Sequence, residues 1–252
     1  MNISDSFSLR RRGLSALSGN WQTALMVTFV AGLLSIAQNT LQVRLDASSL
    51  ANMSVVDNWR NFSIIMGPYS GLITLFALLQ FILSPVLSVG LNTYFLALHR
   101  SENPPFALLF SRIHALIRCL ALYVLMGIFI FLWSLLLLIP GIVAAYRYSM
   151  APFLMADDPD LGALDAINMS KRMMDGHKGR LFALQLSFIG WAFCSMILIG
   201  ILSTMLGILG TALGLFASLA LQVYINSTVA GFYLELLSFQ GLSDNDVQGR
   251  VE

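Results

Sequence analysis

The chain has 252 residues, of which 57% are hydrophobic and 11% are charged, and its mean hydropathy is +0.77. This composition leaves too few polar side chains to cover a water-soluble surface, which excludes an ordinary soluble domain. The formal net charge of +1 is uninformative as a total, because in a membrane protein the placement of Lys and Arg matters and their sum does not. No nucleic-acid partner is expected. The expected surroundings are a lipid bilayer.

The apolar runs are continuous rather than alternating, which favours helices over barrel strands. We predict an all-α fold, a polytopic transmembrane bundle of about six spans with amphipathic helices at the interface. Residues 1–237 would form one domain, and 238–252 a polar cytoplasmic tail. The expected spans are residues 21–42, 71–98, 116–139, 142–156, 181–207 and 213–237.

A short helix is predicted before the first span, capped by Ser4 or Ser6 and lying along the membrane surface. Three arginines at 10–12 form its basic cluster. Arginines before an apolar run also resemble a signal peptide, but a polytopic chain needs no removable signal, and we expect the run to stay as the first span. The apolar face of the predicted helix comprises Phe7, Leu14 and Leu17.

Residues 43–70 are polar and are expected to form a loop outside the bilayer. The second span contains Pro85, which predicts a kink there. Apolar residues recur at helical spacing over 106–118, which indicates an amphipathic helix on the cytoplasmic interface before the third span.

Pro140-Gly141 admits two interpretations, a single long kinked crossing over 116–156 or a hairpin turn between spans three and four. As a helix, 142–156 would extend only ~22 Å, short of a ~30 Å hydrocarbon core. Basic residues precede and follow the whole stretch, so the positive-inside rule places both ends on the same side. This favours the hairpin, with a short or tilted fourth span.

A second amphipathic helix is predicted from Pro159 to Asp175, with Asp158 as its N-cap and Pro159 at its first position. Its helical spacing places Ile167 and Met174 on the apolar face. We expect it to lie at the membrane interface, with Asp165 and Arg172 among the residues of its wet face.

The distribution of the 14 basic side chains supports this topology. All but Arg44, Arg60 and Arg147 fall on the side predicted to be cytoplasmic, together with both termini and the segments 99–115 and 157–180. The turns near Pro140 and Gly210 would face outward. Gly210 and Gly214 form a small-xxx-small spacing that favours close packing between the last two spans.

The segment from Leu125 to Trp191 resembles a known family, the bacterial membrane proteins catalogued as domain of unknown function 975. The resemblance rests on short elements in one order, among them Pro140-Gly141-Ile142, Tyr148-Ser149-Met150-Ala151, Gly176-His177-Lys178 and Ser187-Phe188-Ile189-Gly190-Trp191. Gly19-Asn20-Trp21 and Gly231-Phe232-Tyr233 fit the ends of the family pattern. It implies a six-pass protein of the bacterial plasma membrane, distantly similar to the membrane region of some glycerophosphodiester phosphodiesterases, and it implies no established activity.

No motif indicates catalysis, a cofactor or a metal site, and an enzyme is not expected. Cys119 and Cys194 lie in apolar runs without metal-ligand spacing and are interpreted as small hydrophobic residues. The carboxylates of 157–160 suit a helix start better than a cation site. His177, beside Lys178, is interpreted as an interface cation rather than a base.

Arg147 is the charged residue that the six-span interpretation places well inside a span. It either reaches the outer headgroups between two tyrosines or turns inward as part of a polar centre with Gln80, Gln222 and Asn226. The favoured function is a non-catalytic membrane protein that organises, senses or binds a partner in the envelope, with a membrane protein or a lipid bound. The alternative is a transporter or channel component whose pathway uses these four side chains.

Overall fold

The computed structural model describes residues 6–42, 70–100 and 102–239, and these residues form helices and turns but no strand. Four helices within them are long and apolar enough to cross a membrane: Thr74–His99, Phe106–Leu136, Lys178–Leu206 and Ile208–Phe239. The predicted all-α class is therefore confirmed, whereas a count of six spans is not. The predicted outer loop and most of the predicted tail lie outside the described residues.

The centre of the molecule is a packed region that we call the hub. Every residue of Ala151–Ala156 is buried there, and Tyr94, Phe95, Phe232 and Tyr233 are among its largest buried side chains. The hub comprises α1 (Ser6–Leu17), the carboxyl-terminal half of α5 (Ser70–His99), α8 (Ala151–Asp157), α9 (Ala163–Met173) and the carboxyl-terminal half of α11 (Ile208–Phe239).

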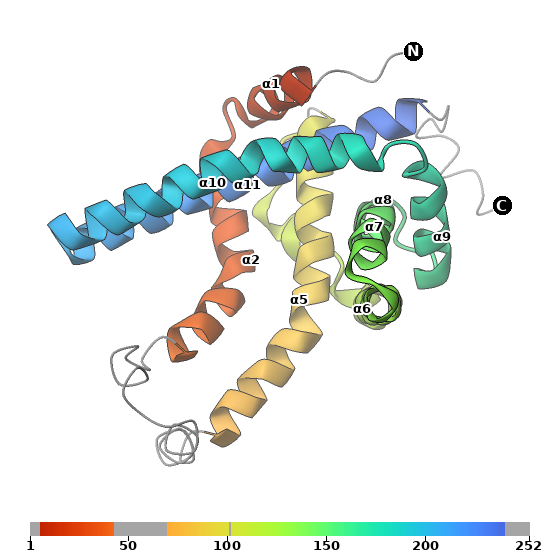
Figure 1. Ribbon diagram of the computed structural model, residues 1–252, viewed down its shortest axis with the longest axis horizontal. Coiled ribbons are helices and arrows are strands. Elements are labelled where there is room, and N and C mark those ends of the chain that lie inside the picture. The colour runs from red at the N-terminus through yellow and green to blue at the C-terminus, as the bar shows by residue number, and fades with distance from the viewer. Residues whose placement is uncertain (1–5, 43–69, 101, 240–252) are drawn as a thin grey trace.

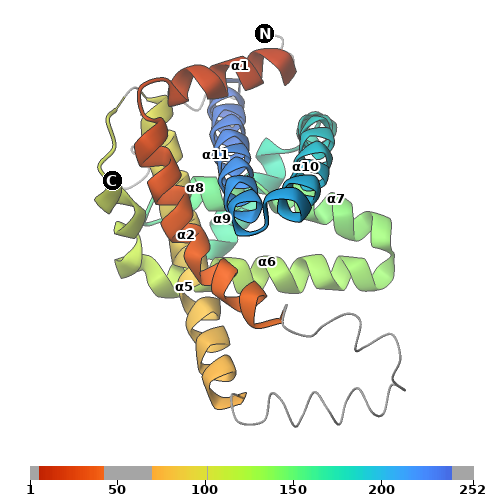
Figure 2. The same cartoon turned by 90° about the vertical axis from the view of Figure 1, so that its left-hand side faces the viewer.

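Apolar helices extend outward from the hub. α6 (Leu116–Leu136) and α7 (Leu138–Tyr148) form a short hairpin, and α10 (Lys178–Leu206) with the first half of α11 forms a long one. α2 (Trp21–Gln42) has the bounds predicted for the first span and runs beside α5. The two hairpins and the α2–α5 pair leave the hub in clearly different directions (Figures 1 and 2).

Pro85 lies inside α5 and divides it into two parts. Leu75, Leu78 and Phe81 before it are exposed, whereas Val86 after it is buried. The proline therefore stands where the helix leaves the hub.

The predicted hairpin between spans three and four is present, but its turn comes earlier than Pro140-Gly141. Leu137 is the extended residue between α6 and α7, with φ −163° and ψ 148°. Pro140 sits in the first turn of α7, where a missing N–H disturbs no helical hydrogen bond. Gly141 packs against Ser134, and a Cβ at this position would overlap the serine side chain.

The predicted fourth span, residues 142–156, is wrong as a single helix. α7 ends at Tyr148, and α8 begins at Ala151 with Pro152 in its first turn. The ring of a proline clashes with the carbonyl four residues earlier, so Pro152 prevents the helix from continuing through 148. Apolar length alone did not reveal this break.

The start predicted for the next helix is also wrong, because α9 begins at Ala163 with Gly162 as N-cap and no side-chain cap. Asp158 instead accepts a hydrogen bond from the N–H of Asp160 at 2.9 Å, which forms a tight turn. The faces predicted for α9 are confirmed, since Ile167 and Met174 are buried. Asp165 and Arg172 are exposed.

Two other amphipathic segments differ from expectation. In α1 the buried face is Leu9, Gly13 and Leu17, whereas Leu14 is 45% exposed. Residues 106–115 form two 3-10 turns, Phe106–Phe110 and Ile113–Ala115, rather than an α-helix. Leu109 packs so closely on α5 that a Cβ at Gly90 would overlap its carbonyl oxygen.

Candidate functional site

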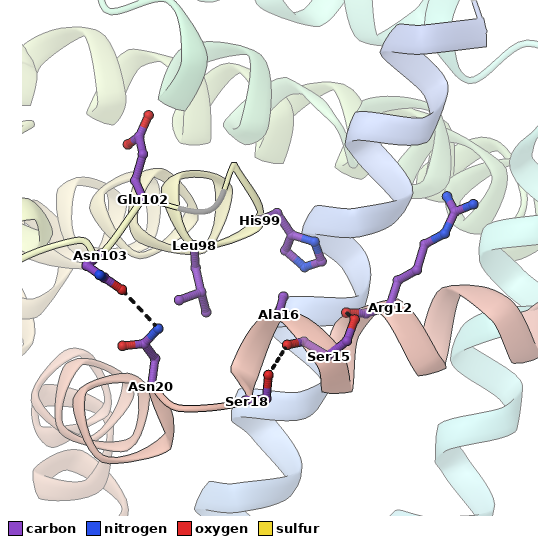
Figure 3. A pocket seen from close by; sticks show the side chains of 9 residues that line it. All are labelled: Arg12, Ser15, Ala16, Ser18, Asn20, Leu98, His99, Glu102 and Asn103. Carbon is purple, nitrogen blue, oxygen red and sulfur yellow. Dashed lines mark hydrogen bonds between the residues drawn. The ribbon is translucent and has the colours of Figure 1, made fainter.

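A pocket of about 470 Å³ lies where the carboxyl ends of α1 and α5 meet the segment that follows α5 (Figure 3). It is bounded by three segments that are far apart in sequence and are brought together by the hub. Its lining residues are Arg12, Ser15, Ala16, Ser18, Asn20, Leu98, His99, Glu102 and Asn103.

The two serines of the pocket donate to the backbone of their own helix end. Ser15 Oγ donates to the carbonyl of Arg12 at 2.8 Å, and Ser18 Oγ donates to the carbonyl of Ser15 at 2.6 Å. Neither hydroxyl therefore bonds to a base that would activate it as a nucleophile. Across the pocket, Asn20 Nδ2 donates to Asn103 Oδ1 at 3.4 Å.

His99 joins the pocket to α11 and α1. Its Nε2 lies 2.8 Å from the carbonyl oxygen of Ser227, and Ser227 Oγ donates to the carbonyl of Gly13 at 2.9 Å. A carbonyl only accepts, so this bond assigns the proton of His99 to Nε2 and leaves Nδ1 as an acceptor in the neutral ring. The histidine is thus a structural link between three helices.

Charged groups of both signs border the pocket. Arg12, whose side chain is exposed, lies 3.4 Å from the largely buried carboxylate of Glu235 on α11. Glu102 forms no side-chain bond with the residues that the structure describes. A pocket with a carboxylate, a guanidinium and two amides suits the binding of a small polar group. Its described polar atoms offer hydrogen bonds and charge, without a paired nucleophile and base.

A second set of polar side chains ties the 157–160 turn to the rest of the hub. Asp157 accepts from Arg100 at 2.7 Å and from Tyr233 at 3.1 Å. Arg118 donates to Asp160 at 3.0 Å and to the carbonyl of Pro159 at 2.8 Å. These contacts explain why the acidic residues do not cap a helix, because each is engaged by a cation or by the turn itself.

Arg112 strengthens the same region from the 3-10 segment. Its Nη2 donates to the carbonyl of Ala156 at the end of α8, and its Nε donates to Thr93 Oγ1 at 3.3 Å. The arginine therefore satisfies a carbonyl that the end of a helix leaves without an intrahelical partner. Within the described residues no group of three His, Cys, Asp or Glu side chains gathers that could hold a metal ion.

Arg147 lies at the end of α7, next to α9. Ser170 Oγ of α9 donates to the carbonyl of Arg147 at 2.9 Å, and Ser170 accepts from the N–H of Met150 at 3.2 Å. The Arg147 side chain is half-buried, and its Nε is buried without a partner in the described part of the chain. Arg147 therefore lies beside α9, the helix that the sequence predicted at the cytoplasmic interface.

The other members of the predicted polar centre form local contacts. Gln222 Nε2 donates to Asn226 Oδ1 at 3.1 Å, one helical turn away on α11. Gln80 Oε1 is buried without a partner among the described residues. None of these three, nor Arg147, lines the pocket, so the structure joins only Gln222 and Asn226 of the four.

His177 closes the base of the long hairpin, where its ring lies edge-on to Phe239 at 5.4 Å. Burial lowers the pKa of His177 below its ordinary value, and Arg180 lowers it further while Asp175 acts in the opposite sense. This favours the neutral ring at neutral pH, in contrast to the predicted interface cation.

The sequence pattern indicates Asp157 only as part of a helix start and does not pair it with Arg100 or Tyr233. Arg100, Asp157 and Tyr233 are separated by 57 and 76 positions along the chain, and no local pattern indicates such pairs. The one feature of the sequence that could have indicated these pairs is the position of Arg100 and Arg118 at the ends of apolar runs.

Residues 135–240 match the model of a family described as "Protein of unknown function (DUF975)". No curated protein and no solved structure matches the chain. The matched segment contains α7 to α11, and the resemblance noted at Gly19-Asn20-Trp21 lies outside it. The chain is therefore similar to the DUF975 family over this segment, which holds both the 157–160 turn and the long hairpin.

Proposed function

We propose that the chain is an integral protein of the bacterial plasma membrane, with both termini in the cytoplasm and a non-catalytic role. It organises, senses or binds a partner in the envelope, and the pocket between α1 and α5 is the surface that takes the partner or a lipid headgroup. The proposal is carried by the contrast between the hub and the helices that leave it.

In the hub, charged side chains bind one another across the sequence, as Arg100 binds Asp157 and Arg118 binds Asp160. The Arg100–Asp157 pair, whose carboxylate is 8% exposed, stabilises one arrangement of the helices, whereas the Arg118–Asp160 pair is exposed. Outside the hub, large apolar side chains such as Met205, Ile208 and Leu209 are exposed. Exposed apolar surface on this scale requires lipid or another membrane helix.

Copurification in mild detergent tests the role of the pocket. Bound proteins and lipids are identified for the wild type, for Glu102→Lys in the pocket and for Asp165→Lys as a control. Both carboxylates are exposed, and Asp165 does not line the pocket. We expect a near-stoichiometric component whose recovery falls at least about fivefold with Glu102→Lys and is retained with Asp165→Lys. Equal recovery from all three forms would contradict the proposal.

The transport alternative rests on one observation, that Gln80 Oε1 and Arg147 Nε are each buried without a partner in the described residues. Buried polar atoms without partners are rare and are found along substrate pathways. A solute flux into protein-containing vesicles that Arg147→Leu abolishes and Asp165→Asn preserves would favour this alternative.

A further inference from the structure

The short hairpin is a continuous apolar surface. The sequence contains no Asp, Glu, Lys, Arg or His between Arg118 and Arg147. At its tip the side chains of Leu135 to Ile139 are between 67% and 76% exposed. A charge-free surface of this kind is suited to hydrocarbon.

The ammonium group of Lys171, on α9, lies at the base of the short hairpin. It lies 5.7 Å from the ring centroid of Phe129 and 5.6 Å from that of Tyr148. Arg147 is at the same level, because Ser170 bonds to its carbonyl. Lysine and arginine keep their charges in water or among headgroups, so Phe129 and Tyr148 lie at the polar boundary.

The distance from this boundary to the tip is short. Leu137 is about eight residues beyond Phe129, which corresponds to ~12 Å of helix, against a hydrocarbon core of ~30 Å. On the return side Tyr148 is 11 residues beyond Leu137, or ~16 Å of helix, and because any tilt reduces the depth that the hairpin reaches, ~16 Å is an upper limit. The tip cannot reach the opposite headgroups.

The long hairpin has an equivalent boundary and a different length. Arg10 lies 5.9 Å above the ring of Phe188, which packs edge-on against Tyr224 at 5.2 Å. From Phe188 to the turn at Gly207 is about 19 residues, or ~28 Å of helix, close to the thickness of the core. The same hub therefore carries one hairpin of crossing length and one of roughly half that length.

We propose that the α6–α7 hairpin is a re-entrant wedge, which enters the leaflet beside α9, turns at Leu137 inside the hydrocarbon and returns to the same side. Its binding partner is the acyl-chain region of that leaflet, with Arg147 and Lys171 at the level of the lipid phosphates. The inference rests on the proposed membrane location. It places the turn of this hairpin inside the hydrocarbon, whereas the sequence interpretation placed the turn near Pro140 on the outer side.

Thiol labelling tests the wedge with a matched pair of positions. Leu138 and Ile208 are the first residues of the return helices, and their side chains are 74% and 87% exposed. Leu138→Cys and Ile208→Cys are each made in a chain carrying Cys119→Ala and Cys194→Ala. The proteins are reconstituted in phosphatidylcholine–phosphatidylglycerol vesicles, and an impermeant maleimide is loaded on both sides by freezing and thawing. Because only the hydrated thiolate reacts, a cysteine within hydrocarbon is protected.

We expect Leu138→Cys to react at least about tenfold more slowly than Ile208→Cys in the bilayer, and both to react alike in detergent. Asn168→Cys on α9 serves as the water-exposed reference. Equal rates at Leu138→Cys and Ile208→Cys in the bilayer would overturn the wedge. Extraction of the whole protein from the vesicles by alkaline carbonate would instead contradict the membrane location itself.

A fluorescence measurement keeps the wedge testable if the cysteine variants fold poorly. Leu138→Trp is placed in a chain whose four tryptophans are replaced by Phe, and its emission is quenched by lipids brominated at different depths. The wedge predicts the strongest quenching by bromines deep in the acyl chains. Strongest quenching by bromines next to the headgroups would show a tip at an interface and overturn the proposal.

Discussion

The α6–α7 and α10–α11 hairpins leave the same hub and are built from similar apolar residues, but they differ in turn and in length. The long hairpin turns at Gly207, with φ 56°, and its helices approach until a Cβ at Gly210 would overlap the carbonyl of Leu202. The short hairpin turns at an extended leucine, and its close contact is Gly141 on Ser134. The close helix approach predicted from Gly210 and Gly214 is confirmed.

The difference in length follows from proline placement in the return helix. Pro152 ends the first return helix after 11 residues, whereas α11 contains no proline and continues for 32 residues. The length of a hairpin is limited by its shorter helix, so one proline separates the short hairpin from the long one. The two hairpins also run crosswise, because α6 is seen nearly end-on where the long hairpin lies across the view, and the reverse holds after the 90° turn (Figures 1 and 2).

The largest expected effect is at α9, on which the short hairpin rests. Replacing Ile167 and Met174 together by Asp places two charges in fully buried positions and should lower the free energy of unfolding by on the order of 5 kcal/mol. The control Asp165→Asn, on the exposed face, should change it by less than about 0.5 kcal/mol. Thermal unfolding followed by size-exclusion chromatography in mild detergent measures both, and similar losses would contradict the assigned faces.

The next effect concerns the contact between α10 and α11. Gly210→Val should destabilise the long hairpin by about 3 kcal/mol, because the new side chain meets backbone atoms of α10 that cannot rotate away. Gly200→Ala in the same hairpin has open space around it and should be neutral or slightly stabilising. Unfolding in detergent checks the pair, and a tolerated Gly210→Val would show that the helices separate at no cost.

A smaller effect is expected at the matching position of the short hairpin. Gly141→Ala should cost about 1–2 kcal/mol, since the Oγ of Ser134 can rotate while its Cα, 2.9 Å from the new Cβ, cannot. Gly127→Ala on α6 meets no atom within 4 Å and is the control. The same unfolding assay measures this change. If Gly141→Ala lowered the free energy of unfolding more than Gly210→Val does, the predicted order of the two effects would be wrong.

Arg147 tests where the base of the short hairpin lies. If its charge reaches nearby headgroups, Arg147→Lys should be neutral and Arg147→Leu should cost about 1 kcal/mol in the bilayer. Unfolding in lipid nanodiscs measures both. If Arg147→Lys destabilises the protein as much as Arg147→Leu does, the guanidinium is required as a planar group with several donors. That result would favour the predicted polar centre.

The smallest expected effect is a pH dependence at the base of the long hairpin. Because the folded protein lowers the pKa of His177 below the unfolded value, the stability contributed by the neutral ring is present above the unfolded pKa. It is lost as the pH falls through the unfolded value toward the lowered one. The melting temperature should therefore fall slightly below about pH 6.5, and His177→Gln should reduce this fall. An unchanged profile in the variant would assign the dependence to other groups.

The features that could be predicted from the sequence are those with a local periodic signal. The faces of α9 follow from helical spacing around Ile167 and Met174, and the chain reversal before α7 follows from the charge distribution. The break at 149–150 was missed because an apolar count treats Pro152 like any other apolar residue. The start of α9 was misplaced because Asp158 accepts from the N–H of Asp160 and forms a tight turn instead of capping a helix.

The candidate site was less predictable than the fold. The pocket depends on the approach of α1 to the end of α5, and the buried face of α1 centres on Gly13, which a search for apolar side chains overlooks. Charged pairs between distant segments have no spacing rule, so Arg100 with Asp157 could only be found in three dimensions.

The hydrogen bond from Ser227 to the carbonyl of Gly13 joins positions 214 residues apart. At synthesis rates of ~5–20 residues per second, about 10 to 40 s pass between the emergence of the two partners from the ribosome. During this interval Leu9 and Leu17, which α11 later helps to bury, have no finished surface to pack on. Truncation within α11 should therefore leave α1 without the surface on which it packs and accessible to protease.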